Sequence, residues 1–333
     1  MTRESGFRVR RLAAWVLLAV IVAGCGDREA SDHDHPDAHG DELPALAPVP
    51  LDEGERLRVV ATTSIVGDVV QQVGGEEIDL TVLLPLGTDP HAFDPAPQDA
   101  AAVADAHVVF INGAGMEVFL DSLLESAGEG VTVISVSSGI ELLSLEGDVH
   151  EEDDHQHGGD DPHVWFDPHN VMVWADNIEQ VLGALDPENA GSYQANGAAY
   201  VAELEALDLW IEEQVAQVDP DKRLLVTDHA SFGYFARRYG FEQVGALFPG
   251  YSTLAEPSAR DLAELESAIA SLGVEAVFVG LTVNPDLAER VAEDTGTQLL
   301  FLYTGSLGEP GGPAGDYISF MQYNVTTIVS ALR

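Results

Sequence analysis

Three histidines of the chain stand in short polar segments that could supply metal ligands. His91 follows the apolar run 78–84, His163 follows an acidic stretch, and His229 follows the apolar run 224–227. Imidazole is the commonest neutral nitrogen ligand for Zn²⁺, and three imidazoles leave the fourth position of a tetrahedral site open. Considered singly, each residue would more often be a hydrogen-bonded structural or surface histidine, so spacing alone leaves both interpretations open.

The elements that must position these histidines form a two-lobed α/β pattern. Short apolar runs, typical of buried parallel strands, alternate with segments of helical periodicity. Strands are expected over 57–62, 78–84, 108–112, 131–136, 224–227, 243–247, 276–279 and 299–302. Because ligands of such sheets bind beyond the carboxyl ends of the strands, the three histidines are expected to meet in a cleft between two lobes.

Helices are expected between the strands and as a long connection between the lobes. Helical spacing covers 65–73 and 118–124, and a helix over 170–185 precedes a longer one over 187–218 that has Pro187 in its first turn. A helix of roughly 30 residues spans about 45 Å, which is enough to join two lobes.

The helix after residue 257 has the clearest boundaries. Ser258 and Asp261 form a capping-box-like start, and Gly273 is expected to end the helix. The buried stripe is expected to consist of Leu262, Leu265, Ile269 and Leu272.

The first residues have the features of an export signal. Four arginines precede an uncharged, largely apolar run from Leu12 to Ala23. A membrane-spanning helix needs roughly 20 apolar residues, whereas this run has the length of a signal-peptide core. The stretch 22–25 resembles the bacterial lipobox, so residues 1–24 are expected to be removed and Cys25 to carry a lipid anchor. Since Cys25 is the only cysteine, the mature chain can form no internal disulfide.

Two acidic segments are expected to be flexible. Residues 25–55 have little apolar content and are expected to form a tether, whereas residues 146–161 are expected to form a surface loop. The loop carries His150, His155 and His157, which could form a weak metal trap or belong to a plain solvated loop.

The net charge excludes one class of partner. The chain carries −43, and −46 without residues 1–24, so its field repels the phosphates of nucleic acid and attracts cations. Such acidity can also reflect a saline habitat. The 309 residues that remain after cleavage are enough for two domains of ordinary size.

Longer motifs around the three histidines resemble the zinc- and manganese-binding solute-binding proteins of bacterial ABC importers, the ZnuA-like family. Residues 87–95 match the motif Gly-x-Asp-Pro-His-x-Phe-x-Pro, and residues 161–165 match Asp-Pro-His-x-Trp. His229 precedes the Gly-Tyr-Phe stretch 233–235 and the Tyr-Gly pair 239–240. The resemblance extends from about residue 56 to the C-terminus.

This resemblance implies a fold, a ligand set and partners. It implies an N-terminal α/β lobe over 56–186, a linking helix over 187–218 and a C-terminal α/β lobe over 219–333, with the metal held between the lobes. The implied metal ligands are His91, His163 and His229. The implied partners are a membrane permease and its ATPase, with the binding protein lipid-anchored at the extracytoplasmic face of the cell membrane.

The sequence departs from the family at the fourth ligand. Many relatives have an Asp between two small hydroxyl residues, and here the matching stretch 303–307 has Gly305 at that position. Glycine has no side chain with which to bind. Water, Glu256, Asp228 or a carboxylate of the acidic loop could complete the coordination.

Alternative functions remain at this level. A three-histidine zinc site could also serve a hydrolase, because zinc lowers the pKa of bound water to about 7, although no His-Glu-x-x-His or Gly-x-Ser-x-Gly motif is present. A metal-binding surface adhesin is a further alternative.

Three nitrogens favour Zn²⁺ over Mn²⁺ as the transported ion, since manganese sites more often include carboxylates. Of the other residues, His107 is expected to be structural, His169 exposed, and Trp165, Trp174 and Trp210 part of the core.

Overall fold

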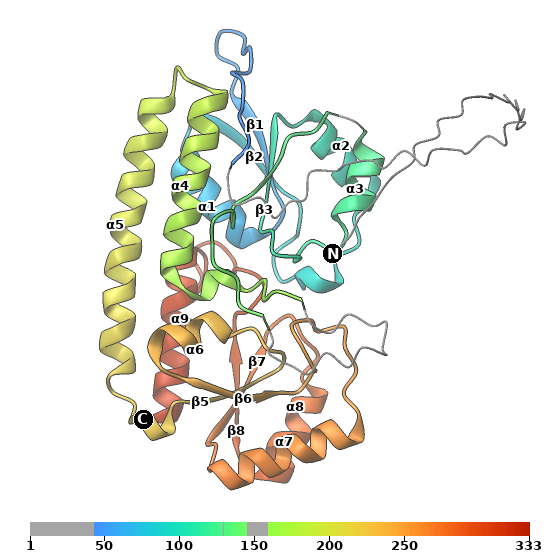
Figure 1. Cartoon of the computed structure of the whole chain (residues 1–333), viewed down its shortest axis with the longest axis vertical. Helices are drawn as coiled ribbons and strands as arrows, with labels where there is room; N and C mark the ends of the chain where they lie inside the picture. Colours follow the sequence, from blue (N-terminus) through green and yellow to red (C-terminus); the bar gives the residue numbers. More distant parts are fainter. Residues whose placement is uncertain (1–42, 129, 145–158) are drawn as a thin grey trace, which may run out of the picture. The chain divides into compact units, whose positions relative to one another are not determined.

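The computed structural model describes residues 43–128, 130–144 and 159–333, which form two parallel four-stranded sheets (Figure 1). The first sheet has the order β2-β1-β3-β4 and consists of β1 (Leu57–Ala61), β2 (Ile78–Val82), β3 (Val108–Ile111) and β4 (Val133–Ser135). The second has the order β6-β5-β7-β8 and consists of β5 (Leu224–Thr227), β6 (Glu242–Ala246), β7 (Ala276–Gly280) and β8 (Gln298–Leu302). The expected architecture of two α/β lobes with parallel sheets is confirmed.

Helices connect successive strands within each sheet, as parallel pairing requires. In the first lobe these are α1 (Ser64–Gly74), α2 (Pro97–Asp105) and α3 (Leu120–Ala127). In the second they are α6 (Gly233–Tyr239), α7 (Ala259–Leu272) and α8 (Asp286–Thr295). Short 3₁₀ turns lie at Pro90–Ala92, Val164–Phe166 and Pro220–Lys222. The segments that follow the carboxyl ends of the strands include the turn Pro90–Ala92, and this is the edge of each sheet where the functional residues are expected.

Three longer helices accompany both lobes. They are α4 (Pro168–Leu185), α5 (Ala190–Val215) and α9 (Tyr317–Leu332). Helix α5 packs against α4, against α1 of the first lobe and against α9, which follows the second sheet (Figure 1). A long helix therefore connects the lobes, although within the described residues no helix is both long and apolar enough to cross a membrane.

The apolar core alternates between the two faces of each sheet, as the pleat dictates. In β1, Leu57 and Val59 belong to the largest core cluster, whereas Val60 belongs to a smaller cluster on the other face. The largest cluster also contains Phe278 of β7, so it continues from one sheet to the other. The lobes are therefore packed on a shared core and are not merely tethered by a helix.

Two expected helix starts are wrong by a few residues. Helix α5 begins at Ala190 and not at Pro187, because the carboxylate of Asp186 accepts hydrogen bonds from the side chains of Asn189 and Tyr193, both 2.8 Å, and holds a turn there. Helix α3 begins at Leu120, and Val118, expected in its first turn, is 72% exposed.

The helix with the clearest sequence boundaries has its expected ends. Ser258 and Asp261 form the capping box of α7, and Gly273 ends it with a φ of 70°. Leu265 and Ile269 are buried, but Leu272, expected on the buried stripe, is 50% exposed. The stripe therefore ends one turn before the helix does.

Part of the expected tether is packed. Four apolar side chains lie partly buried against the core, namely Leu43, Leu46, Val49 and Leu51, and the Val49 N–H donates to the Leu185 carbonyl over 2.8 Å. The expectation of a tether as far as residue 55 is thus wrong for this stretch, because these regularly spaced apolar residues can bury. The export signal, Cys25 and the histidines of the acidic loop lie outside the described residues.

Candidate metal centre

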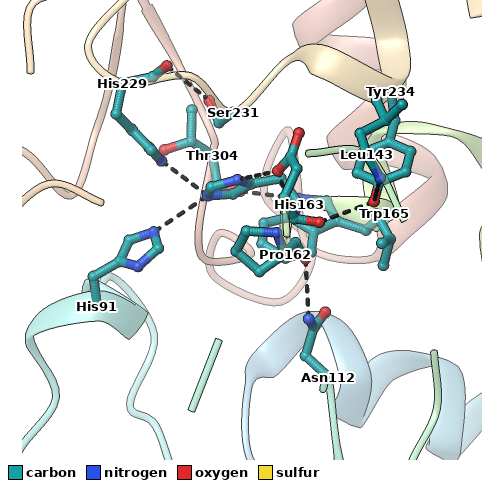
Figure 2. Close-up of polar contacts among 12 residues, drawn as sticks. His91, Asn112, Leu143, Pro162, His163, Trp165, His229, Ser231, Tyr234 and Thr304 are labelled. Atoms are coloured by element: carbon teal, nitrogen blue, oxygen red, sulfur yellow. Dashed lines mark hydrogen bonds and ion pairs between the residues drawn. The ribbon is translucent and has the colours of Figure 1, made fainter. Parts of the chain in front are cut away.

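The structure brings the three expected histidines together between the lobes (Figure 2). The Nε2 atom of His163 lies 3.2 Å from Nε2 of His91 and 3.0 Å from Nε2 of His229. All three rings are buried, and one ligand atom of each lies within 4.8 Å of the others. Tetrahedral zinc with bonds of about 2.0–2.1 Å would hold its ligand nitrogens about 3.3–3.4 Å apart, which is close to the two distances from His163.

Two of the rings are oriented by a carboxylate that precedes them in the chain. Asp161 Oδ1 accepts from the backbone N–H of His163 over 3.0 Å and lies 2.8 Å from its Nδ1. Asp228 Oδ1 contacts both the backbone N–H and Nδ1 of His229, each over 2.7 Å. A carboxylate at Nδ1 fixes the proton on that nitrogen and leaves the lone pair of Nε2 free to bind a metal.

These carboxylates make the centre attractive to a cation. With both Asp161 and Asp228 ionised, His163 and His229 hold their protons on Nδ1, so their Nε2 atoms both present lone pairs across 3.0 Å. Two such acceptors repel each other unless a proton or a metal ion lies between them. The arrangement therefore fits a shared divalent ion better than it fits a hydrogen bond between rings.

His91 is positioned by its backbone. It lies in the 3₁₀ turn Pro90–Ala92, after β2, and its N–H donates to Oδ1 of Asp89 over 3.0 Å. The other oxygen of Asp89 accepts from the Thr253 hydroxyl of the second lobe over 2.5 Å. The turn that carries His91 is thereby fixed to the opposite lobe.

Burial keeps two of the imidazoles, those of His91 and His163, neutral. Burial, together with the neighbouring charge of His229, lowers the pKa of His91 to about 4. The pKa of His163 is lowered well below its ordinary value, first by burial and then by the two neighbouring histidines. A neutral ring is the form that can bind a metal.

The two carboxylates behave differently. Burial raises the pKa of Asp161 to about 7, against the lowering effect of the His163 N–H, and its Oδ2 is buried without a hydrogen-bond partner among the described residues. Burial would also raise the pKa of Asp228, but attraction to His229 and hydrogen bonds from His229 and Gly280 outweigh it, so this pKa is lowered. The carboxyl group of Asp228 is therefore more completely ionised than that of Asp161.

The segment of His163 is held from several elements. Asn112, after β3, donates from Nδ2 to the Pro162 carbonyl over 3.0 Å, and the Tyr234 hydroxyl of α6 donates to the Asp161 carbonyl over 2.9 Å (Figure 2). The Trp165 ring lies edge-on to His163 with centroids 5.2 Å apart, and its Nε1–H donates to the Thr304 carbonyl over 3.2 Å. The ligand position is thus built from both lobes.

No carboxylate within the described stretches joins the three-histidine group. Asp228, one of the expected candidates for the fourth ligand, is occupied on the far side of the His229 ring, with Oδ2 accepting from Gly280 N–H over 2.7 Å. Glu256 is exposed. Gly305 lies against Pro90. Among the expected fourth ligands, this leaves water and the acidic loop.

The other residues singled out in the sequence have structural roles. His107 accepts at Nδ1 from the Arg58 N–H over 3.0 Å, and the His169 side chain is 50% exposed. Trp165 and Trp174 are buried, whereas Trp210 is only partly buried against the core. The expectations for His107, His169, Trp165 and Trp174 are confirmed, with Trp165 contacting the site as well, whereas Trp210 lies outside the fully buried core.

Sequence reasoning missed the orienting role of the aspartates. Asp89 and Asp161 each stand two residues before a histidine, and Asp228 stands one before. The recurrence of an acidic residue just before each candidate ligand was a signal that could have revealed this role, because a histidine that binds metal commonly donates its other N–H to a carboxylate.

Comparison with known proteins agrees with this geometry. Residues 59–331 match the ZnuA family, described as zinc-uptake complex component A periplasmic. The chain is 34% identical over 318 residues to the manganese-binding lipoprotein MntA of Halalkalibacterium halodurans, which covers 95% of this chain and 96% of that protein. It is 31% identical over 287 residues to the iron ABC transporter substrate-binding lipoprotein MtsA of Streptococcus pyogenes serotype M1, covering 84% and 90%.

A solved structure shows the same fold. The periplasmic zinc-binding protein TroA of Treponema pallidum superposes with a TM-score of 0.75 at 28% identity, covering 84% of this chain and 99% of that one. The match over residues 59–331, the shared fold and the three converging histidines together show that the chain belongs to the ZnuA family.

Proposed function

We propose that the chain captures Zn²⁺ between its lobes through Nε2 of His91, His163 and His229 and delivers it to a membrane permease. Its role as the substrate-binding subunit of an ABC metal importer follows from its family. The identity of the metal and the ligand set are the proposed parts.

The observation that carries the choice of zinc is the all-nitrogen donor set. The three ligand atoms are imidazole nitrogens, and no carboxylate of the described residues joins them. Mn²⁺ prefers carboxylate, carbonyl and water oxygens, whereas imidazole suits Zn²⁺. The position at which many relatives supply a carboxylate is Gly305 in this chain.

Manganese is the second candidate, favoured by the names of relatives. MntA is named for manganese, MtsA for iron and TroA for zinc. Because three relatives of similar sequence identity to this chain carry three metal names, likeness to any one of them is weaker support than the donor atoms of this site.

A competition titration tests the metal. The protein, purified and stripped with a chelator, is titrated with Zn²⁺ and with Mn²⁺ in calorimetry, and each metal is then used to displace the other. We expect one tight equivalent of Zn²⁺ that a large excess of Mn²⁺ does not displace. Tighter binding of Mn²⁺, or tight zinc binding that survives replacement of both His163 and His229 by Ala, would overturn the proposal.

We infer a carrier and not a hydrolase for the same site. Asp161 and Asp228, the carboxylates that contact the ligand rings, face Nδ1, on the side away from the metal-binding Nε2 atoms. They are therefore poorly placed to act as a general base on metal-bound water. Two of the relatives named above, MntA and MtsA, are binding lipoproteins by name.

Membrane attachment is proposed through Cys25, at the extracytoplasmic face, where the protein would deliver the metal to the permease that works with its ATPase. Incorporation of radiolabelled palmitate into the wild-type protein, and its loss in Cys25→Ala, tests the anchor. Label that persists in Cys25→Ala would exclude this residue as the acylation site.

A further inference from the structure

The side chain of Glu117 is a buried carboxylate that lies in the segment between β3 and α3. Its Oε1 accepts from the Thr62 hydroxyl over 2.6 Å and from the Asn112 N–H over 2.7 Å, and its Oε2 accepts from the Gly113 N–H over 3.1 Å. Thr62 directly follows β1, and Asn112 directly follows β3. The carboxylate therefore joins the carboxyl ends of two neighbouring strands.

The backbone between Asn112 and Glu117 is wound in the left-handed direction. Gly113, Ala114 and Gly115 have φ values of 80°, 52° and 77°. In the part of the chain that the structure describes, Ala114 is the only residue other than glycine with a positive φ. A side chain disfavours this conformation, which persists only where surrounding contacts impose it. The hydrogen bonds from the Asn112 and Gly113 N–H groups to Glu117 close the turn and supply such contacts.

This turn presents the Asn112 amide to the segment of His163. Nδ2 of Asn112 donates to the carbonyl of Pro162, the residue before His163, over 3.0 Å and to the Gly113 carbonyl over 2.8 Å. Its Oδ1 is buried without a hydrogen-bond partner among the described residues, and an unsatisfied buried acceptor costs free energy. The orientation of the amide toward Pro162, visible in Figure 2, is therefore imposed by the turn that carries it.

We propose that Glu117 is a positioning residue for the metal centre. It holds the backbone of Asn112 and Gly113, so that the Asn112 amide fixes the Pro162 carbonyl and with it the backbone from which the His163 ring reaches the site. This role deepens the proposed function and rests on it, since His163 must be a metal ligand. It also gives a reason for a buried carboxylate, which is costly to keep unless several hydrogen bonds stabilise it.

A small change at Glu117 should reach the metal. In Glu117→Gln only one oxygen remains, so either the Asn112 N–H or the Gly113 N–H faces an NH₂ group in place of an acceptor. The turn should then relax and shift the amide that holds Pro162. Because metal–ligand distances vary by only about 0.2 Å, a slight displacement of His163 weakens binding without the loss of any ligand.

The experiment is a double-mutant cycle of Glu117→Gln and Asn112→Ala. Zinc affinity is measured by competition with a chromophoric chelator for the wild type, the two single variants and the double variant. We expect each single variant to bind about tenfold more weakly, the lower end of the range found when a partner of a metal ligand is lost. The double variant should bind no more weakly than Asn112→Ala alone, because both substitutions act on the same peptide. The visible absorption of bound Co²⁺ should change in all three variants.

Asp186→Asn is the matched control. Asp186 is a buried carboxylate of the first lobe that accepts from the side chains of Asn189 and Tyr193, each over 2.8 Å, at the start of α5 and not at a ligand segment. We expect both Asp186→Asn and Glu117→Gln to lower the urea midpoint of unfolding measured without metal. Only Glu117→Gln should weaken zinc binding.

Three outcomes overturn the role of Glu117: wild-type affinity in Glu117→Gln, an equal loss of affinity in Asp186→Asn, and a double variant whose loss is the product of the two single losses. If Glu117→Gln does not fold, Thr62→Val takes its place, because it removes one donor to the carboxylate and keeps the shape of the side chain. It should weaken zinc binding several-fold in the wild type and not at all in Asn112→Ala.

The same measurements separate this role from the proposed function. Wild-type affinity in Glu117→Gln together with lost affinity in His163→Ala overturns the role of Glu117 alone. If the wild type prefers Mn²⁺ and the cycle shows the same coupling with that ion, the choice of zinc fails and the role of Glu117 stands.

Discussion

The Nε2 atoms of His163 and His229 face each other across 3.0 Å, while the Nδ1 atom of each ring faces its own aspartate. Rings held in this way by a carboxylate at Nδ1 direct their Nε2 atoms toward a shared cation.

The central ring should be indispensable. Replacing His163, which lies between the other two, by Ala removes one of three nitrogens, and we expect zinc affinity to fall by more than about a hundredfold, the upper range seen for loss of an outer-shell partner. Chelator competition measures the effect. His169→Ala, in which an exposed ring is lost, is the control and should bind as the wild type does. Equal losses in the two variants would contradict the assignment.

The aspartate behind His229 should tune the affinity without being a ligand. Asp228 accepts through both oxygens, from His229 and from the Gly280 N–H, and an Asn offers only one oxygen. We expect Asp228→Asn to weaken zinc binding by roughly 10- to 100-fold. Asp176→Asn, on the exposed side of α4, should have no effect. An unchanged affinity in Asp228→Asn would show that the carboxylate does not set the tautomer of His229.

Metal binding should resist mild acid. A free imidazole gains its proton near pH 6.5, and the sequence alone would place metal release there. Burial lowers the pKa of His91 to about 4, and that of His163 is also lowered, so these rings remain neutral below pH 6.5 while the lobes stay packed. We expect zinc affinity to weaken only moderately between pH 7.5 and about 5, where Asp161 with its pKa of about 7 gains a proton, and to fall steeply toward pH 4. A steady decline that begins at pH 6.5 would indicate that protonation opens the site first.

Asp68 should make the protein less stable as pH rises. Burial raises its pKa from 3.8 to about 6, although the Tyr317 N–H at the start of α9 donates to it over 2.9 Å. Below pH 3.8 both folded and unfolded forms are protonated and no penalty exists. Between that pH and about 6 the folded form binds more protons than the unfolded form, so the free energy of unfolding falls as pH increases.

Asp68→Asn removes this titration. We expect the variant and the wild type to have similar unfolding free energies near pH 4, and the variant to be more stable by up to about 3 kcal/mol at pH 7. Urea unfolding at the two pH values measures the difference. A stability difference that is independent of pH would show that Asp68 does not titrate in this window.

Much of the fold could be predicted from the sequence, because the features concerned are local. Apolar runs indicated all eight strands, and the capping box of Ser258 and Asp261 with Gly273 set the ends of α7. Errors arose where a distant or side-chain contact overrode local preference. The start of α5 is set by the carboxylate of Asp186, and residues 43–51 are ordered by a core that their own composition does not reveal.

The candidate ligands and the family could be predicted without the fold, because both depend on residue types at fixed spacing around His91, His163 and His229. The convergence of the three Nε2 atoms, the contact of each neighbouring aspartate with its histidine, and the packing of Gly305 against Pro90 could not, because they join segments that are brought together by folding. Gly305 and Pro90 are more than two hundred residues apart in the chain. Their contact exists only because two sheets on a shared core bring the ends of β2 and β8 together, a result of packing that no local pattern contains.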